Sequence, residues 1–184
     1  YYTVTELVGT GLDTLVDGQS VGYQKGPIDL GGAFAVVKLV DRKIVPDSVQ
    51  ARHILIPFAG ATRADESITR NPQEARVLAD SLYAYLEENP SAFESVSEEF
   101  SSDIVAKEKG GDLGYFSRGS MAKPFENFCF FKKNGSMGVV PTQFGWHVIQ
   151  VTDQNGSNDV YKIGQIIREI LPSEETIQGL YNQA

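Results

Sequence analysis

Hydrophobic and polar residues alternate with two different periods in the central part of the chain. Residues 51–58 (ARHILIPF) form an apolar run of β type, and we expect a strand there. A helix is expected next, because Asn71 can cap it, Pro72 suits its first position and Glu74 can complete a capping box. Its apolar positions follow helical spacing: Ala75, Leu78, Leu82, Tyr85 and Leu86.

Further elements follow at regular intervals. Asn89-Pro90 ends the first helix, and Ser91 with Glu94 offers a second capping box for a helix whose buried stripe would be Phe93, Val96 and Phe100. The next elements are a strand at 112–116, a third helix at 123–131 that ends at Asn134-Gly135, and a strand pair at 139–140 and 146–151. The predicted order is β-α-α-β-α-β-β, an α+β fold in which helices pack on a sheet.

Two segments flank this core. In residues 1–48, the stretch Tyr1–Val8 is rich in β-forming residues, turn residues follow, and 34–40 is a strand candidate. In residues 154–184, a strand is expected at 160–170 and a short helix at 173–181, capped by Ser173 after Pro172. We interpret both segments as parts of a flanking framework around a domain at 49–153.

Composition and charge exclude several classes of function. The 184 residues carry a net charge of −8, and their 16 Lys and Arg are scattered, so nucleic acid is not expected as a partner. No apolar run approaches the roughly 20 residues that cross a bilayer, so the chain is not expected to span a membrane. The chain begins with Tyr1 and shows no leader, so we expect any signal or anchor to lie outside it. Cys129, the single cysteine, stands among phenylalanines, which predicts a buried, unreactive thiol.

Three blocks carry the chemistry: 51–56 (ARHILI), 110–116 (GGDLGYF) and 142–149 (TQFGWHVI). The only two histidines, His53 and His147, stand in the first and third blocks, each within an apolar run. A histidine in such a run is more often a core residue than a catalyst. The order and spacing of the blocks, however, resemble the parvulin family of peptidyl-prolyl cis-trans isomerases over roughly residues 50–153. The resemblance implies a parvulin-like antiparallel sheet and extends to multidomain bacterial foldases and chaperones. Residues 1–48 and 154–184 look like remnants of a neighbouring domain of that kind, and 1–48 is alternatively the remnant of a degenerate parvulin-like unit.

The resemblance also implies roles for particular residues. Leu113, Met121 and Phe125 would form the socket for a proline ring, and Phe144 would add an apolar wall where some relatives have a small polar residue. For Leu113 and Phe125, a place in an ordinary core would explain the side chain equally well. Met121 is more informative because its surroundings in the sequence are polar and loop-like.

A polar network is implied beneath this socket. His53, His147 and Thr142 match the family's paired histidines and threonine, whose role would be to orient the pocket rather than to transfer protons. Counting forward from Phe100-Ser101 places Asp103 where relatives carry a cysteine or aspartate facing the amide, whereas counting back from Leu113 places Ile104 there. We favour Asp103, and the alternative is a turn or cap residue after a helix.

Other kinds of site are disfavoured. The block 110–114 lacks the Gly-Lys-Ser/Thr ending of a phosphate loop and precedes a strand. A metal site of His53, His147 and Asp103 is conceivable, but no pair has the close spacing of metal motifs, so neither metal nor cofactor is expected. The loop 60–67 mixes one arginine with two acids, which disfavours selectivity for phosphoserine.

The sequence therefore leads to one main functional hypothesis and two alternatives. The main hypothesis is a cofactor-free isomerase of X-Pro bonds in unfolded or nascent exported polypeptides, without a covalent intermediate. One alternative is a chaperone module that binds extended hydrophobic segments with little isomerase activity. The other is a structural interaction domain with both histidines in its core. A periplasmic or cell-envelope location is implied by the resemblance alone.

Overall fold

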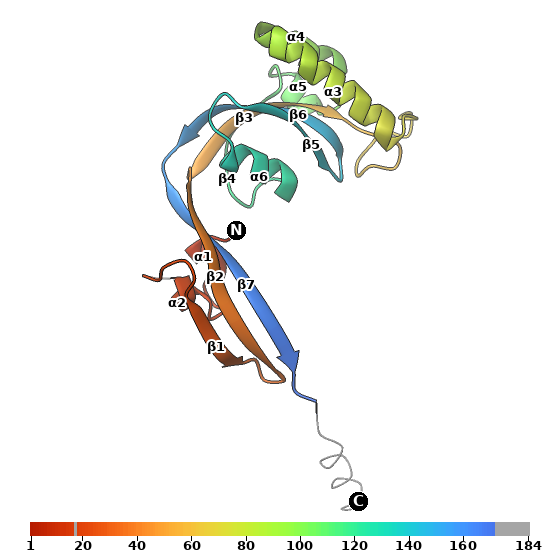
Figure 1. The fold of residues 1–184 in the computed structure, drawn as a ribbon. Coiled ribbons are helices and arrows are strands. Elements are labelled where there is room, and N and C mark those ends of the chain that lie inside the picture. The colour runs from red at the N-terminus through yellow and green to blue at the C-terminus, as the bar shows by residue number, and fades with distance from the viewer. Residues whose placement is uncertain (17, 172–184) are drawn as a thin grey trace, which may run out of the picture. The chain divides into compact units, whose positions relative to one another are not determined.

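The computed structural model describes residues 1–16 and 18–171. The chain divides into two compact units (Figure 1). Unit 1 combines residues 1–44 with the segment that starts at 158, and unit 2 is the continuous stretch 45–157. Unit 1 is thus built from two separated parts of the sequence, whereas every element of unit 2 comes from one uninterrupted stretch.

Unit 2 contains a four-stranded sheet with helices on both faces. Its strands are β3 (Ser48–Ile56), β4 (Asp112–Ser117), β5 (Met137–Thr142) and β6 (Gly145–Asn155). Its helices are α3 (Pro72–Glu88), the 3-10 turn η1 (Pro90–Ala92), α4 (Phe93–Phe100), α5 (Ile104–Lys107) and α6 (Lys123–Phe131). The strand order is β4-β3-β6-β5, and all neighbouring pairs are antiparallel. The expected α+β class and antiparallel sheet are confirmed, and the short elements η1 and α5 are additional.

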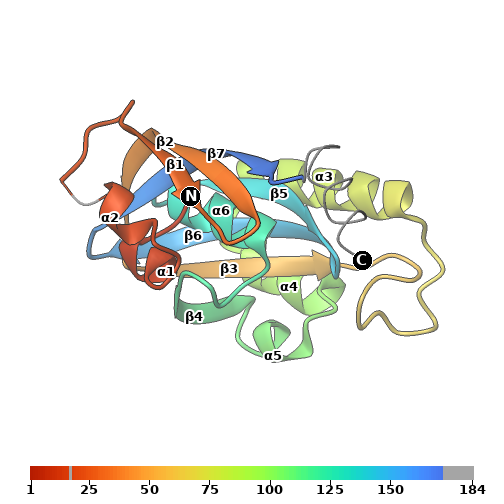
Figure 2. The ribbon, with the colours of Figure 1, turned by 90° about the horizontal axis from the view of Figure 1, so that it is seen from below.

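The sheet separates two layers. Helices α3 and α4 cover one face, and α6 lies against the other (Figures 1 and 2). The core between the sheet and α3 and α4 contains Ile54, Ile56, Ala75, Ala79, Leu82, Leu86, Phe93, Val96 and Val148. Because successive side chains of a strand point to opposite faces, His53 and Leu55 of β3 and His147 of β6 face the α6 side. Leu55 pairs directly with His147 across the two strands, so this register places these side chains on one face.

Helix α3 begins as the sequence predicts. The Asn71 side chain accepts hydrogen bonds from the backbone of Gln73 and Glu74, and the Glu74 carboxylate accepts one from the Asn71 backbone. Tyr85 keeps the helical spacing of the apolar positions but is not part of the buried stripe, since its side chain is 50% exposed. The stripe instead runs through Ala79, because positions 75, 79, 82 and 86 share the face that meets the sheet.

The segment after α3 departs from the prediction. Ser91 falls inside the turn η1, and α4 begins at Phe93 with Ala92 at its N-cap, so the expected capping box of Ser91 with Glu94 is not formed. Helix α5 was not expected. It starts after Asp103, whose side chain accepts a hydrogen bond from the backbone N–H of Ala106 (3.1 Å).

Gly111 brings the turn before β4 close to β3. Its φ of +90° lies in the left-handed region, and a Cβ atom there would meet the carbonyl oxygen of His53 at 2.8 Å. The Gly111 carbonyl accepts a hydrogen bond from the His53 N–H (2.9 Å). Only glycine allows both the positive φ and the close approach. The contact fixes the position of the backbone that carries the His53 side chain.

Unit 1 is a three-stranded sheet with two helical turns. The strand order is β1 (Gln24–Asp29), β2 (Ala33–Val45) and β7 (Asn158–Glu169), and the turns are α1 (Val4–Leu7) and α2 (Asp13–Val16). Its small core contains Leu7, Val16, Leu39 and Tyr161.

The predictions for unit 1 have mixed outcomes. The strands expected at 34–40 and 160–170 are confirmed as parts of β2 and β7. The β character expected for Tyr1–Val8 is wrong, because Thr3 and Glu6 form a capping box that starts α1. Only Tyr2 makes a bridge, to Tyr161. The helix expected at 173–181 lies outside the described residues.

Candidate active site

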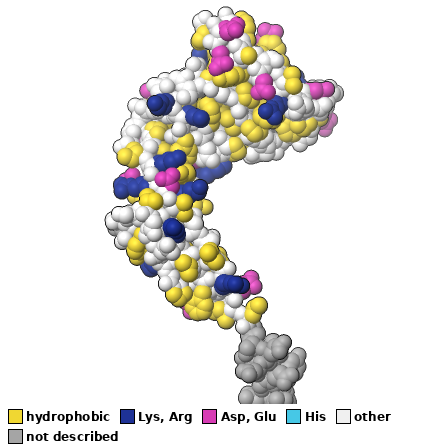
Figure 3. Space-filling model, in the orientation of Figure 1, with side chains coloured by type: hydrophobic (Ala, Val, Ile, Leu, Met, Phe, Trp, Pro, Cys, Tyr) yellow, Lys and Arg dark blue, Asp and Glu magenta, His cyan; other side chains and the backbone are white. Residues whose placement is uncertain are grey.

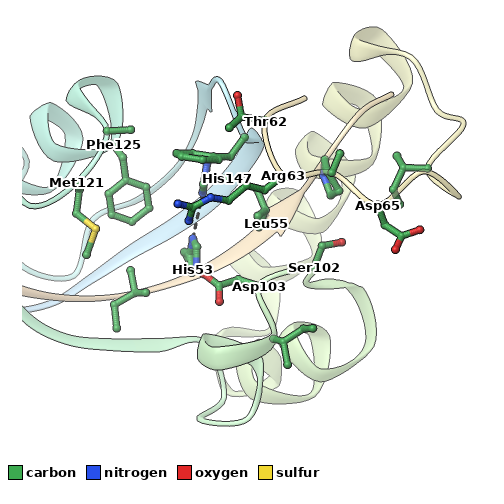
Figure 4. Close-up of a pocket in the computed structure, with 17 residues that line it drawn as sticks. His53, Leu55, Thr62, Arg63, Asp65, Ser102, Asp103, Met121, Phe125 and His147 are labelled. Carbon is green, nitrogen blue, oxygen red and sulfur yellow. Dashed lines mark hydrogen bonds and ion pairs between the residues drawn. The ribbon is translucent and has the colours of Figure 1, made fainter. Parts of the chain in front are cut away.

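A pocket with a volume of about 580 Å³ opens on the α6 side of the sheet in unit 2 (Figure 4). This volume lies within the range of sites that hold small ligands or short peptide segments. Seven of the residues singled out from the sequence line it: His53, Asp103, Leu113, Met121, Phe125, Phe144 and His147. Thr142, also singled out, does not line the pocket but forms a hydrogen bond with His147. The structure therefore brings together residues from five separate elements and from three connecting segments.

One side of the pocket is apolar. Leu113 comes from β4, Met121 from the loop before α6, and Phe125 from the first turn of α6. The Phe125 ring stands edge-on to both imidazoles, with centroids 5.6 Å from His53 and 5.3 Å from His147. Phe125 is only 3% exposed and its ring also contacts Phe116, so its position is fixed by packing. Leu113 and Met121 remain half-buried and leave apolar surface open to a ligand.

A fully buried carboxylate holds the loop that carries Met121. The Glu126 side chain is 0% exposed and accepts a hydrogen bond from the Gly119 backbone N–H and one from Lys123 Nζ (3.3 Å). The Arg118 guanidinium approaches the same carboxylate at 3.9 Å. These contacts tie the loop 118–121 to α6. Sequence reasoning missed Glu126, because nothing in the pattern distinguishes it from a solvated first-turn acid.

A continuous hydrogen-bond chain runs under the pocket. Asp103 Oδ2 lies 3.0 Å from His53 Nε2, and His53 Nδ1 lies 3.0 Å from His147 Nδ1. His147 Nε2 lies 2.8 Å from Thr142 Oγ1, which also accepts a hydrogen bond from the Phe144 backbone N–H (3.1 Å). The two imidazoles are nearly parallel, at 17°, and both are buried. Residues 53 and 147 thus meet in space, as the hypothesis requires.

In the state with Asp103 ionised and both imidazoles uncharged, the donors and acceptors fix the direction of every hydrogen bond in this chain. An ionised Asp103 can only accept, so Nε2–H of His53 donates to it, and Nδ1 of a neutral His53 is then an acceptor. Nδ1–H of His147 must therefore donate to His53, which leaves His147 Nε2 to accept from the Thr142 hydroxyl. The bonds run in one direction from Thr142 to Asp103, and each imidazole is locked in one tautomer.

Burial and hydrogen bonding set the charges in this chain. The hydrogen bond from His53 lowers the pKa of Asp103 from its ordinary 3.8 to about 2, against the opposing effect of burial, and the Ala106 N–H adds to the lowering. Burial lowers the pKa of His147 to about 3, and the neighbouring His53 adds to that effect. At neutral pH, Asp103 is therefore a carboxylate and His147 an uncharged imidazole.

Asp103 caps a helix, as one of the two alternatives from the sequence has it, and also belongs to the hydrogen-bond chain, whereas its place opposite a substrate amide stays a prediction. Its Oδ1 accepts from the Ala106 N–H and caps α5, while its Oδ2 accepts from His53. The other candidate for this position, Ile104, also lines the pocket but is 70% exposed and makes no polar contact with its side chain.

The far wall of the pocket was not foreseen. It is formed by residues of the loop after β3, namely Thr62, Arg63, Ala64, Asp65 and Ile68, and the pocket is further lined by Leu55, Pro57 and Ser102. The Thr62 N–H donates to the Gln143 carbonyl (2.8 Å), which fastens the loop 59–70 to the β5–β6 turn. The Arg63 guanidinium lies 5.8 Å from the Phe144 ring centroid. Loop residues of this kind carry no periodic signal, so only their position after β3 could have indicated a pocket wall.

Nucleophilic and metal chemistry have no support in the described residues. Cys129 is fully buried as expected, and burial raises the pKa of its thiol to about 12. Within residues 1–16 and 18–171, no group of three or more His, Cys, Asp or Glu could hold a metal ion. His53, His147 and Asp103 lie together, but their nitrogen and oxygen atoms bond to one another. The same part of the chain contains no helix long and apolar enough to cross a membrane.

Comparison with known proteins places this geometry in context. The family model described as "PPIC-type PPIASE domain" matches residues 34–155. Foldase protein PrsA 2 of Bacillus cereus is 26% identical over 147 residues, which cover 79% of this chain and 50% of that protein. Foldase protein PrsA 1 of the same species is 30% identical over 117 residues, which cover 63% and 39%. The chain therefore spans half or less of the length of these relatives.

A solved structure shows the same likeness. Peptidyl-prolyl isomerase ESS1 from Candida albicans superposes with a TM-score of 0.52 and 26% sequence identity, over 58% of this chain and 63% of that one.

Proposed function

The chain belongs to the PPIC-type peptidyl-prolyl isomerase family, and from this premise we propose that it accelerates cis-trans isomerisation of X-Pro bonds in unfolded or newly exported polypeptides. Uncatalysed rotation must cross a barrier of about 18–20 kcal/mol, because the planar amide is stabilised by resonance. No covalent bond breaks, so the reaction needs neither a nucleophile nor a redox group. The catalyst must grip the proline and favour the twisted amide over the planar one.

The proposal divides the site into a socket and a floor. Leu113, Met121 and Phe125 would bind the proline ring by apolar contact, and Phe144 would close the pocket beside it. The chain from Thr142 to Asp103 would keep the floor rigid, with both imidazoles in fixed tautomers. The Asp103 carboxylate would act through its field on the amide, whose charge separation falls as it twists. The single observation that carries the proposal is that Phe125 of the apolar socket stands edge-on to both of the paired imidazoles.

A peptide assay tests the proposed activity. The exchange rate of an Ala-Pro bond is measured by NMR, or in a protease-coupled format, with wild-type protein and with a double variant, Met121→Ala with Phe125→Ala. Wild-type protein should accelerate exchange, and the double variant should lose most of the acceleration. Val77→Ala serves as the matched control, because Val77 is 55% exposed on α3 and does not line the pocket. An inactive wild type, or an unimpaired double variant, would remove the proposal.

The chaperone alternative has one observation in its favour. Six large apolar side chains of the unit 1 sheet are exposed: Phe34, Val36, Val40, Ile44, Ile166 and Ile167. Hydrophobic side chains gather over β2 and β7 in Figure 3. Surface of this kind can bind unfolded chains. Strong suppression of the aggregation of a proline-free client by a variant without isomerase activity would support this alternative.

We also propose that the protein acts outside the cytoplasm, in the periplasm or cell envelope. The support is its likeness to the foldases named above. The first residues of the full-length precursor test this part, because a signal peptide occupies roughly 15 to 30 residues with a charged start and an apolar centre.

A further inference from the structure

Helix α5 presents two adjacent aliphatic side chains to solvent. Ile104 is 70% exposed and Val105 69%. Across 45–157, where every residue is described, these are the two most exposed large apolar residues, and no other two of that class are sequence neighbours. The remaining ones, Val77, Tyr85 and Tyr115, are separated in sequence, and the Tyr115 hydroxyl is bonded to Asp153. An exposed aliphatic pair gains meaning from its place beside a ligand pocket, because it adds to the apolar surface that a bound chain can cover.

One member of the pair belongs to the pocket. Ile104 lines the pocket, and Val105 is its exposed neighbour on α5. Asp103, the residue before Ile104, is bonded to His53 on the pocket floor (Figure 4). The exposed pair therefore begins one residue away from the hydrogen-bond chain.

Backbone hydrogen bonds hold α5 at both ends. The Ser102 N–H donates to the Leu55 carbonyl (2.9 Å), and the Gly111 N–H donates to the Ala106 carbonyl (2.7 Å). The pair thus has a fixed position relative to the socket, and an extended chain that leaves the socket on this side would meet it within a few residues.

We propose that Ile104 and Val105 form an apolar subsite that binds an aliphatic or aromatic side chain of the client two to four residues from its proline. This inference rests on the proposed function, because it takes the socket as the place of the proline. The occupant is a segment of unfolded polypeptide rather than a folded partner. Two side chains supply far less than the roughly 800 Å² per partner of a stable protein interface, but they suffice for one side chain of an extended peptide.

Matched peptides test the subsite. Each peptide carries one Ala-Pro pair and either Leu or Ser at a single position two, three or four residues before or after the proline. Dissociation constants are measured by NMR titration for wild-type protein and for the double variant Ile104→Ser with Val105→Ser. Val77→Ser is the control, since it removes an exposed valine far from the pocket wall.

The informative quantity is the ratio of the Ser-peptide to the Leu-peptide dissociation constant within one protein, so that a general loss of binding cancels. At one of the positions, wild-type protein and Val77→Ser should prefer Leu by about three- to tenfold, the effect of burying part of one aliphatic side chain. In the Ile104/Val105 double variant the ratio should fall to about one, which is the value expected when no apolar surface is buried.

Isomerisation rates of the same peptides separate this inference from the proposed function. Accelerated exchange of the Ser peptides, combined with a Leu preference that is absent or that survives in the double variant, overturns the subsite and leaves the isomerase proposal intact. A Leu preference that disappears in the double variant, without acceleration of any peptide, supports the subsite as a binding surface and overturns the isomerase proposal.

Discussion

His147 shows how burial sets the chemistry of a single residue. Burial lowers its folded-state pKa to about 3, whereas an unfolded histidine titrates near 6.5, so the unfolded chain binds the additional proton between these values. The neutral ring therefore contributes its full stability above pH 6.5, and this contribution is lost as the pH falls toward 3. Relative to His147→Asn, wild-type stability should fall by up to about 1.4 kcal/mol per pH unit in this window.

Urea denaturation at several pH values between 7 and 4 measures this dependence for both proteins. The difference between their unfolding free energies isolates His147 from the carboxylates that titrate in the same range. Parallel pH profiles for the two proteins would contradict the assignment of His147 as a buried, neutral ring.

For Asp103, the stability that comes from capping α5 can be separated from the stability that comes from its negative charge. Its pKa is lowered mainly by the hydrogen bond from His53, so its charge stabilises the fold above about pH 4, and this stabilisation disappears as the pH falls through 2. Asn is also a good N-cap, so Asp103→Asn should cost about 1–2 kcal/mol at pH 7 and progressively less below pH 4. Asp103→Ala also removes the cap of α5. Its cost in unfolding free energy should exceed that of Asp103→Asn by about 1 kcal/mol, both at pH 7 and below pH 4. Equal losses for the two variants would show that Asp103 does not cap α5 in solution.

At the scale of elements, the loop 118–121 depends on α6 through Glu126. Replacing this buried carboxylate by Gln keeps its shape but removes the charge that faces Lys123 and Arg118. Glu126→Gln should therefore lower the free energy of unfolding by about 1–3 kcal/mol. If the loop also loosens, Met121 shifts, and KM for a proline peptide should rise more than kcat falls. Glu99→Gln, an exposed position on α4, should change neither property.

The measurements are chemical denaturation and steady-state isomerase kinetics on the same preparations. A loss of stability with unchanged KM would show that Glu126 stabilises the fold without placing Met121.

Elements with a strong local signal could be predicted from the sequence. The third helix was predicted at 123–131 and is α6, and the Asn71 capping box opens α3 as expected. Helix α5 was missed because four residues are too few to show a period. The capping box predicted for Ser91 with Glu94 was wrong because a 3-10 turn precedes α4. Capping residues do not distinguish a 3-10 turn from an α-helix.

In the candidate site too, only the residues with a clear signal in the sequence could be predicted. His53, Thr142 and His147 stand in strands whose order in the sequence matches a known family, so the resemblance could bring them together. The wall formed by Arg63, Asp65 and neighbouring residues depends on how a loop folds back on the β5–β6 turn. A tertiary contact of this kind leaves no pattern in one sequence.

At the scale of the molecule, the two units differ in how their cores are assembled. The core between the sheet and α3 and α4 lies entirely within 45–157. The core of unit 1 joins Leu7 and Val16 to Leu39 and Tyr161, and so needs both separated parts of the chain. We therefore expect unit 2 to fold by itself, whereas the core of unit 1 is incomplete without β7. The interpretation of the flanking segments as a remnant of a neighbouring domain stays a prediction.

A fragment of residues 45–157 tests this difference in autonomy. Because its sheet, both helical layers and the whole hydrogen-bond chain from Thr142 to Asp103 come from this stretch, the fragment should unfold in one cooperative transition. It should also keep the isomerase activity of the longer chain on short proline peptides. A fragment of residues 1–44 alone lacks β7 and should show no cooperative transition. Circular dichroism with thermal unfolding checks both fragments. A 45–157 fragment without a cooperative transition would show that the flanking segments are needed to complete its core.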